Sequence, residues 1–445
     1  MVSENHFIHE PTRLKIIFRS LQYRNYRLFF SGQSLSLIGT WIQRIALPWL
    51  VYHLTDSAFF LGLVGFAGQI PTFLLASFAG VLTDRWNRYH ILIITQILAM
   101  VQALILAFLF FMGIIEVWHI IILSVVLGCI NSFDIPARQA FLVEMVEKKE
   151  DLGNAIALNS SMVNSARLLG PSIAGVLIAS IGEGICFFIN GVSYLFVIIS
   201  LLLMRVHSQK KRTQNPNVFK ALKEGFSYTF SFVPIKSIIL LLGLISLMGM
   251  PYAVLMPIFA KEILHGGSHT FGFLMGASGI GAFLGAIYLA SRKSILGLEK
   301  VIPISAGIFG LGLVTISLSR IFLLSLILMV LTGLGMMLQL ASSNTIIQTI
   351  VDDDKRGRVM SIYAMAFIGT APFGSFLAGS MASVIGAPKT LLICGTFCVS
   401  GAFIFASNLT KLRKKIRPIY VKMGIISKIS AAAQTETDLS VSPEE

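Results

Sequence analysis

Residues 58–112 read AFFLGLVGFAGQIPTFLLASFAGVLTDRWNRYHILIITQILAMVQALILAFLFFM. Two long apolar runs flank one short turn, and the turn holds the charged residues Asp84, Arg85 and Arg88. A bilayer core of about 30 Å needs about 20 apolar residues for each spanning helix. This stretch therefore predicts two membrane helices joined by a short charged turn.

The same pattern fills most of the chain. Of its 445 residues, 55% are hydrophobic and 13% are charged, and the mean hydropathy is +0.80, far more apolar than a soluble protein of this length. We expect twelve transmembrane helices, at residues 26–52, 58–82, 90–112, 117–145, 152–180, 185–205, 235–263, 270–291, 300–319, 321–349, 357–385 and 388–409. The predicted fold class is an all-α polytopic membrane protein.

The basic residues predict the orientation of these spans. Lys and Arg gather in alternate connecting segments, beginning with the N-terminal one, whereas the opposite loops hold Lys261, Arg320 and Lys389. Cytoplasmic loops carry the excess of basic residues, so both termini should be cytoplasmic and the protein should lie in the cell inner membrane. Residues 1–25 lack the apolar core of a cleavable signal, so we expect the first span to direct insertion. The net charge of +14 is then explained by anionic headgroups, not by nucleic acid.

Two halves are indicated by a repeat. In the first half, a run from Arg138 to Val146 is followed by a charged turn and a helix with Gly170-Pro171. The same order returns in the second half, where a run from Asn344 to Val351 is followed by a charged turn and a helix with Pro372. Two pseudo-symmetric bundles of six helices follow from it. The predicted parts are a cytoplasmic N-terminal segment, a six-helix bundle, a cytoplasmic linker, a second six-helix bundle and a mobile cytoplasmic tail, at residues 1–25, 26–206, 207–234, 235–409 and 410–445.

The turn after the second span resembles the signature loop of the major facilitator superfamily, G-x-L-x-D-R-x-G-R. Asn87 stands where the motif has its second glycine, and Asn tolerates the left-handed conformation that this glycine would supply, so we expect the turn to survive. A carboxylate in this turn can face the positive N-terminus of a neighbouring helix and favour one conformation of a transporter. The resemblance implies a conformational latch built from Gly80, Asp84, Arg85, Arg88 and Gly357.

A longer resemblance covers nearly the whole chain from Leu21 to the last span. The strings from Asn131 to Ala140, from Asn154 to Asn159, from Ala166 to Gly175 and from Arg356 to Ser361 are similar to one branch of that superfamily, which includes enterobactin exporters and macrolide-efflux proteins. It implies export of a small amphipathic molecule, such as a siderophore or a macrolide-like drug, by alternating access. The alternatives are a passive or inward carrier, such as a lysophospholipid transporter, and a membrane sensor or assembly factor without transport.

Small residues mark two of the predicted spans as packing faces. Gly170, Pro171 and Gly175 of the fifth span loosely resemble an antiporter motif, although ordinary close packing explains them equally well. In the eighth span, glycines recur at helical spacing from Gly272 to Gly285, and we expect them to form a close contact between the two halves.

Charge inside a membrane span is costly and therefore a guide to function. Asp134 and Arg138 lie four residues apart in the fourth span and can pair on one face, and Arg167 lies in the middle of the fifth. These three residues are candidates for proton coupling or for a gate. A purely structural ion pair is the alternative for Asp134 and Arg138.

A polar stripe in the first span predicts a lining of the substrate cavity. Arg44 follows polar residues at helical spacing, and no acid lies in its own helix, so it could hold an anionic group of the substrate; a partner such as Asp134 is the alternative. The second half offers polar or adaptable side chains for the same cavity. The candidate cavity residues are Gln33, Thr40, Arg44, Tyr252, Met256, Gln339 and Asn344.

The motifs of enzyme chemistry do not occur in this sequence. We find no phosphate-binding loop, no recognisable metal-ligand spacing and no set of nucleophile and base, so we expect no enzyme activity, no cofactor and no metal. The four cysteines fall inside apolar spans, where they act as small hydrophobes. We expect a monomer in the bilayer that moves a small molecule by antiport with protons.

The latch gives the first testable prediction. Asp84→Asn should slow or abolish transport while membrane insertion stays intact, because the carboxylate favours one conformation and does not hold the fold. Flux measured in vesicles, together with the amount of inserted protein, tests this. Normal flux from a well-expressed variant would refute it.

Overall fold

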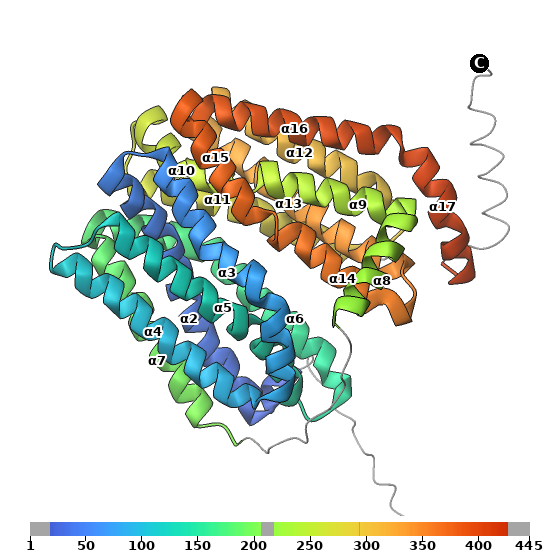
Figure 1. The fold of residues 1–445 in the computed structure, drawn as a ribbon, viewed down its shortest axis with the longest axis horizontal. Helices are drawn as coiled ribbons and strands as arrows, with labels where there is room; N and C mark the ends of the chain where they lie inside the picture. Colours follow the sequence, from blue (N-terminus) through green and yellow to red (C-terminus); the bar gives the residue numbers. More distant parts are fainter. Residues whose placement is uncertain (1–17, 206–217, 293, 426–445) are drawn as a thin grey trace, which may run out of the picture. The chain divides into compact units, whose positions relative to one another are not determined.

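The computed structural model describes residues 18–205, 218–292 and 294–425 (Figure 1). The regular elements in these ranges are all helices. Eleven helical segments of the described chain are long and apolar enough to cross a membrane. The twelfth spanning helix, α2, has 32 residues but carries Arg44 and the polar stripe, which lower its hydropathy. The prediction of an all-α chain with twelve spanning helices in two bundles is confirmed.

The first half begins with a short 3-10 helix, η1, and continues through six long helices. The predicted spans agree with them to within a few residues at most ends. Their bounds are Arg19–Gln22 for η1, Arg24–Thr55 for α2, Ala58–Arg85 for α3, Arg88–Phe111 for α4, Val117–Glu144 for α5, Lys149–Ile181 for α6 and Glu183–Leu202 for α7.

The second half begins with an amphipathic helix, α8, inside the predicted linker. Two of its spans are interrupted, so it has more elements than spans. The bounds are Val218–Ser231 for α8, Val233–Leu244 for α9, Ile245–Gly249 for η2, Tyr252–Ile258 for α10, Phe259–Ile263 for η3, Ser268–Ser291 for α11, Leu298–Leu318 for α12, Phe322–Ile350 for α13, Asp353–Ile368 for α14, Ala371–Ile385 for α15, Ala387–Ser407 for α16 and Leu409–Lys422 for α17.

The interruptions have identifiable causes. The predicted span 235–263 contains two π-helical turns, η2 and η3, with Pro251 and Pro257 between them; proline removes a backbone donor, and π-turns often mark functional positions. The predicted span 357–385 breaks between α14 and α15 at Gly369, just before Pro372 in the first turn of α15.

Helix α17 lies in the first part of the predicted tail. It buries Leu412, Ile416 and Tyr420, and Arg413 donates two hydrogen bonds, of 3.0 and 3.1 Å, to Glu299 of α12. Burial and the Glu299 carboxylate raise the pKa of Tyr420 to about 12. Mobility of residues 410–445 stays a prediction, and residues 426–445 lie outside the described ranges.

The chain forms two compact units. The first contains residues 1–50 and 74–213, and the second contains residues 51–73 and 214–445. In the first, α4 packs on α5 and α7, and an apolar core gathers around Tyr26, Phe29 and Phe141. In the second, α12 packs on α13 and α16, and α11 packs on α13 (Figure 1).

The glycines of the predicted eighth span bring α11 and α13 together. A Cβ atom at Gly281 would lie 1.8 Å from the carbonyl oxygen of Val330, and one at Gly333 would lie 1.9 Å from that of Ser278. The backbones of the two helices therefore touch directly. The expectation that this face joins the two halves of the sequence is wrong at Gly281 and Gly285, because both face α13 of their own half.

This contact predicts a large effect of one methyl group. Gly281→Ala should destabilise the protein by about 1–3 kcal/mol, the usual cost of overpacking a core. Thermal unfolding in detergent should therefore begin at a lower temperature. Gly307→Ala in α12 is the matched control, because a Cβ atom there meets nothing within 4 Å. Equal unfolding midpoints for the two variants would contradict the prediction.

Candidate functional site

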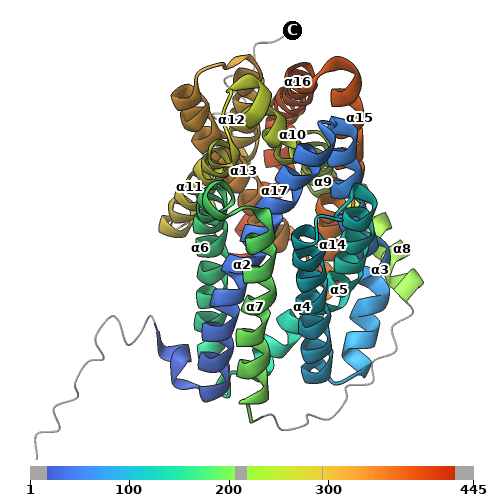
Figure 2. The same ribbon diagram turned by 90° about the vertical axis from the view of Figure 1, so that its left-hand side faces the viewer.

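Helices α2 and α6 pack side by side in the first unit (Figure 2). Their contacts advance together along both chains: Tyr26 Oη donates to the carbonyl of Ala155 at 2.8 Å, Leu37 packs with Met162 and Ala166, and Trp41 fills the space beside Gly170. The two helices are therefore parallel, and residue n of α2 lies near residue n+129 of α6. Gly170 permits this approach, since a Cβ atom there would lie 2.3 Å from that of Trp41.

Two predicted site residues flank the contact between Trp41 and Gly170. Arg44 follows Trp41 by one turn and is exposed, with its Cζ atom 4.8 Å from the centre of the Trp41 ring. Arg167 precedes Gly170 by one turn and is half-buried. Among the described residues, no carboxylate lies within ion-pair distance of Arg44. Its proposed pairing with Asp134 is therefore absent in this structure.

The other polar residues of α2 differ in their surroundings. Gln33 is buried, and its Oε1 atom has no hydrogen-bond partner among the described residues. Thr40 donates to the carbonyl of Ser36 in its own helix at 2.9 Å. Gln43 belongs to a buried network, because it donates to Gln102 at 3.2 Å and accepts from Asn190 at 2.7 Å. The stripe is therefore partly structural.

The cavity candidates from the second half make contacts inside the second unit. Tyr252 shares a hydrogen bond of 2.8 Å with Ser278, and Met256 is fully buried. Gln339 is buried on α13, and half-buried Asn344 accepts a hydrogen bond from Gln348 at 2.9 Å. A role of Tyr252, Met256, Gln339 and Asn344 in binding substrate stays a prediction.

Asp134 is held by three donors in the first unit. The carboxylate is 5% exposed and pairs with Nη2 of Arg138 at 3.1 Å, as the spacing predicted. Its other oxygen accepts hydrogen bonds from Thr95 at 3.1 Å and Gln96 at 2.7 Å, both on α4. These contacts compensate the burial of the carboxylate. Sequence analysis missed Thr95 and Gln96, because nothing in the spacing says which face of α4 meets α5.

The predicted latch is described only in part. The side chain of Asp84 lies outside the described part of the structure, Arg85 is exposed, and Nη1 of Arg88 pairs with Glu144 at 2.6 Å. Asn87 is not left-handed, contrary to expectation: it has φ −72° and caps α4 by accepting a hydrogen bond from the amide of Tyr89 at 3.0 Å. A glycine at this position would have no side chain to accept that hydrogen bond.

The glycines of the predicted sites have different surroundings. A Cβ atom at Gly80 or Gly357 would meet nothing within 4 Å, whereas the space beside Gly170 is occupied by the Trp41 side chain. Pro171 lies inside α6 without ending it, and Gly175 follows one turn later. Packing is therefore a demonstrated role for Gly170, and the roles of Gly80 and Gly357 remain predictions.

A charged cluster that sequence analysis missed joins the end of α2 to η3. Nζ of Lys261 pairs with Asp56 at 2.5 Å and lies 5.3 Å from the centre of the Tyr52 ring. The Tyr52 hydroxyl in turn donates to the carboxylate of Glu262. We call these four residues the outer cluster, since the basic-residue pattern predicts that they lie on the side opposite the termini. Lys261 was visible as one of the few basic residues there.

Next to the outer cluster, the first part of α3 packs closely on α15. A Cβ atom at Gly62 would lie 2.6 Å from the carbonyl oxygen of Ser375 and 2.7 Å from Cα of Gly379. Phe59 and Phe66 meet the ring of Phe376 with centroid distances of 5.9 and 5.7 Å. Helices separated by about 300 residues in the sequence are thus in direct contact.

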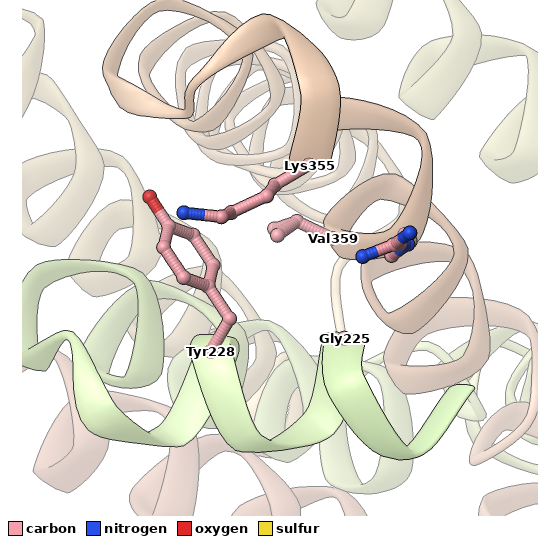
Figure 3. A pocket seen from close by; sticks show the side chains of 5 residues that line it. Gly225, Tyr228, Lys355 and Val359 are labelled. Atoms are coloured by element: carbon pink, nitrogen blue, oxygen red, sulfur yellow. The ribbon is translucent and has the colours of Figure 1, made fainter. Parts of the chain in front are cut away.

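A cleft of about 260 Å³ lies between α8 and α14 (Figure 3). Gly225 and Tyr228 of α8 face Lys355, Arg358 and Val359 of α14. Nζ of Lys355 lies 4.6 Å from the centre of the Tyr228 ring. Asp352 also contacts both residues, at 3.4 Å from the Tyr228 hydroxyl and 3.5 Å from Lys355, and partly neutralises the cleft.

The four cysteines are free thiols, and no group of three His, Cys, Asp or Glu side chains gathers in the described ranges as metal ligands would. The polar residues described above form ion pairs and hydrogen bonds. Such contacts can bind and release a molecule.

Proteins similar in sequence to this chain are transporters. Residues 17–419 match the family model described as "Transmembrane secretion effector". The staphyloferrin A transporter of Staphylococcus aureus is 28% identical over 390 residues, which cover 87% of this chain and 97% of that protein. Macrolide efflux protein A of Streptococcus pyogenes is 21% identical over 394 residues, covering 86% and 96%.

Solved structures support the fold. A bacterial homologue of the human lysosomal transporter Spinster, in an inward-facing and unoccupied conformation, has a TM-score of 0.68 and 14% identity, and covers 88% of this chain and 98% of that one. The predicted resemblance is confirmed, and these relatives are transporters, not enzymes. The chain belongs to the transmembrane secretion effector family of major facilitator transporters.

Proposed function

We propose that this protein is a secondary active exporter of a small amphipathic molecule, a siderophore or a macrolide-like drug, and that it works by proton antiport. The observation that carries the proposal is similarity along nearly the whole length of the staphyloferrin A transporter. The similarity to macrolide efflux protein A has the same extent. The orientation with both termini in the cytoplasm and the monomeric state belong to the same proposal.

Alternating access needs contacts that form in one conformation and break in another. The outer cluster suits this role, because Tyr52 and Asp56 precede Lys261 and Glu262 by about 200 residues and come from the other half of the sequence. An exposed ion pair is worth at most about 1 kcal/mol, so it can be broken during a transport cycle. We assign the outer cluster to closure of the exit on the side opposite the termini.

Proton antiport requires a carboxylate that loads and releases a proton. Asp134 is the candidate, with Arg138 leaving it in one conformation. The three donors around Asp134 favour a second candidate function, a passive or inward carrier, because all of them belong to the same half of the sequence and need not separate when the transporter changes conformation.

Vesicles with an imposed pH gradient separate the two functions. If Asp134 couples, Asp134→Asn should abolish uphill transport driven by protons but spare downhill exchange, because the amide cannot ionise while the cavity remains. The probes are a siderophore and a macrolide, each assayed with and without the gradient. Thr95→Val is the matched control, since it removes one donor to Asp134 but keeps the carboxylate.

The outcomes are distinct. Loss of both kinds of transport in Asp134→Asn and in Thr95→Val would mean that the network is structural. Uphill transport retained by Asp134→Asn would exclude coupling through this residue. Flux of the same rate with and without the gradient would overturn proton antiport and leave the passive carrier.

Charge reversal tests the outer cluster. Lys261→Asp should slow export by about fivefold or more, because it replaces an attraction of up to about 1 kcal/mol with repulsion from Asp56. The double variant Lys261→Asp with Asp56→Lys should regain most of the rate. Lys389→Asp is the control, as Lys389 is exposed and is predicted to lie on the same side. A double variant as slow as the single one would count against the gate.

A further inference from the structure

We propose that Arg44 and Arg167 form one dicationic site that binds a carboxylate group of the transported molecule. The inference rests on the proposed function, since it assigns a chemical class to the substrate of that same transporter. The class of ligand is inferred from the arrangement of charge on α2 and α6.

The register of the two helices brings the arginines within reach of one ligand. Arg44 lies level with residue 173 of α6 by the parallel register, six residues beyond Arg167. At a rise of about 1.5 Å per residue, this separates their Cα atoms by about 9 Å along the axis. Long arginine side chains can close that gap. A carboxylate between them could accept hydrogen bonds from both guanidinium groups.

The charge balance around Arg44 favours an anion from outside the chain. Two like charges in a span repel each other, and each is costly to keep in the bilayer interior. No described carboxylate neutralises Arg44, and Asp134, a buried acid of the same unit, is already held by Thr95, Gln96 and Arg138. Binding of an anion would relieve the repulsion between Arg44 and Arg167, whereas a cationic or neutral substrate would not.

Trp41 positions Arg44 for this task. It lies one turn before Arg44, and its Cβ and Cγ atoms occupy the space beside Gly170 of α6, where a side chain would clash. The guanidinium group of Arg44 is held beside that ring by a cation–π contact. An exposed arginine would otherwise sample many rotamers, so this contact lowers the entropy lost on binding. Arginine has a planar fork of donors that matches a carboxylate, and lysine has not.

Binding of citrate to the purified protein in detergent tests the inference, with triethyl citrate as the uncharged control probe. Wild-type protein should bind citrate and not the ester. Arg44→Gln and Arg167→Gln should each weaken citrate binding about tenfold or more, the usual cost of losing a charge-assisted hydrogen bond. Arg44→Lys should recover only part of the loss. Arg320→Gln, at an arginine that bonds backbone carbonyls, should change nothing.

A second measurement does not depend on the affinity for citrate. In a background in which the native cysteines are replaced, the Arg44→Cys variant should react faster with an anionic methanethiosulfonate reagent than with a cationic one. Adding Arg167→Gln should remove that preference. An unchanged preference would show that Arg167 does not act at position 44, and would overturn the inference.

The remaining outcomes separate the possible sources of the anion and the two levels of the proposal. Citrate binding that survives both Gln variants overturns the site. If phosphatidylglycerol protects the thiol of the Arg44→Cys variant and citrate does not, the arginines hold a lipid headgroup and the assignment to a substrate is wrong. If citrate binds through both arginines but vesicles transport no tested molecule, the site stands and the proposed function fails. If transport is unaffected in Arg44→Gln and Arg167→Gln, the proposed function stands and the dicationic site is wrong.

Discussion

Water is absent from the bilayer core, so every backbone amide and carbonyl that crosses it must find its partner inside the protein. The described chain meets this constraint with helices alone. Polar side chains obey it as well: the hydroxyls of Ser34, Thr83 and Thr332 each donate to the carbonyl four residues earlier in the same helix. Such residues cost little in a span, and they do not by themselves mark a binding site.

Charged side chains cannot be satisfied so locally, and their partners distinguish structure from function. Asp134 draws three donors from α4 and α5, which makes it a well-compensated charge. Arg44 has an aromatic ring and another cation nearby, but no carboxylate in the described residues. The first arrangement is stable without a ligand. The arrangement around Arg44 leaves a charge that an anionic ligand would compensate. Arg44 is therefore a stronger candidate for a functional residue than Asp134.

Close backbone contacts show where helices are locked together in this conformation. The contact of α11 with α13 lies inside one half of the sequence, whereas the contact of α3 with α15 and the outer cluster join residues from both halves. A contact within a half can persist through a transport cycle. A contact between halves must open if the exit on that side is to open. The π-turn η3 contains Lys261 and Glu262, and η2 lies in the same predicted span, so the proposed gate coincides with a local irregularity of the helix.

The number of spans, most of their ends and the family were determined by the sequence itself, because the length of an apolar run and the spacing of a motif are local properties. The pairing of Asp134 with Arg138 was also accessible, since four residues make one turn of a helix. The partners of Asp134 on α4, the partner of the Gly281 face and the outer cluster were decided only by the tertiary structure. So was the approach of Arg44 to Arg167, which depends on the parallel register of α2 and α6. The physical reason is that apolar helices present similar surfaces all around, so their rotation and register are chosen by packing among distant residues and cannot be read along one helix.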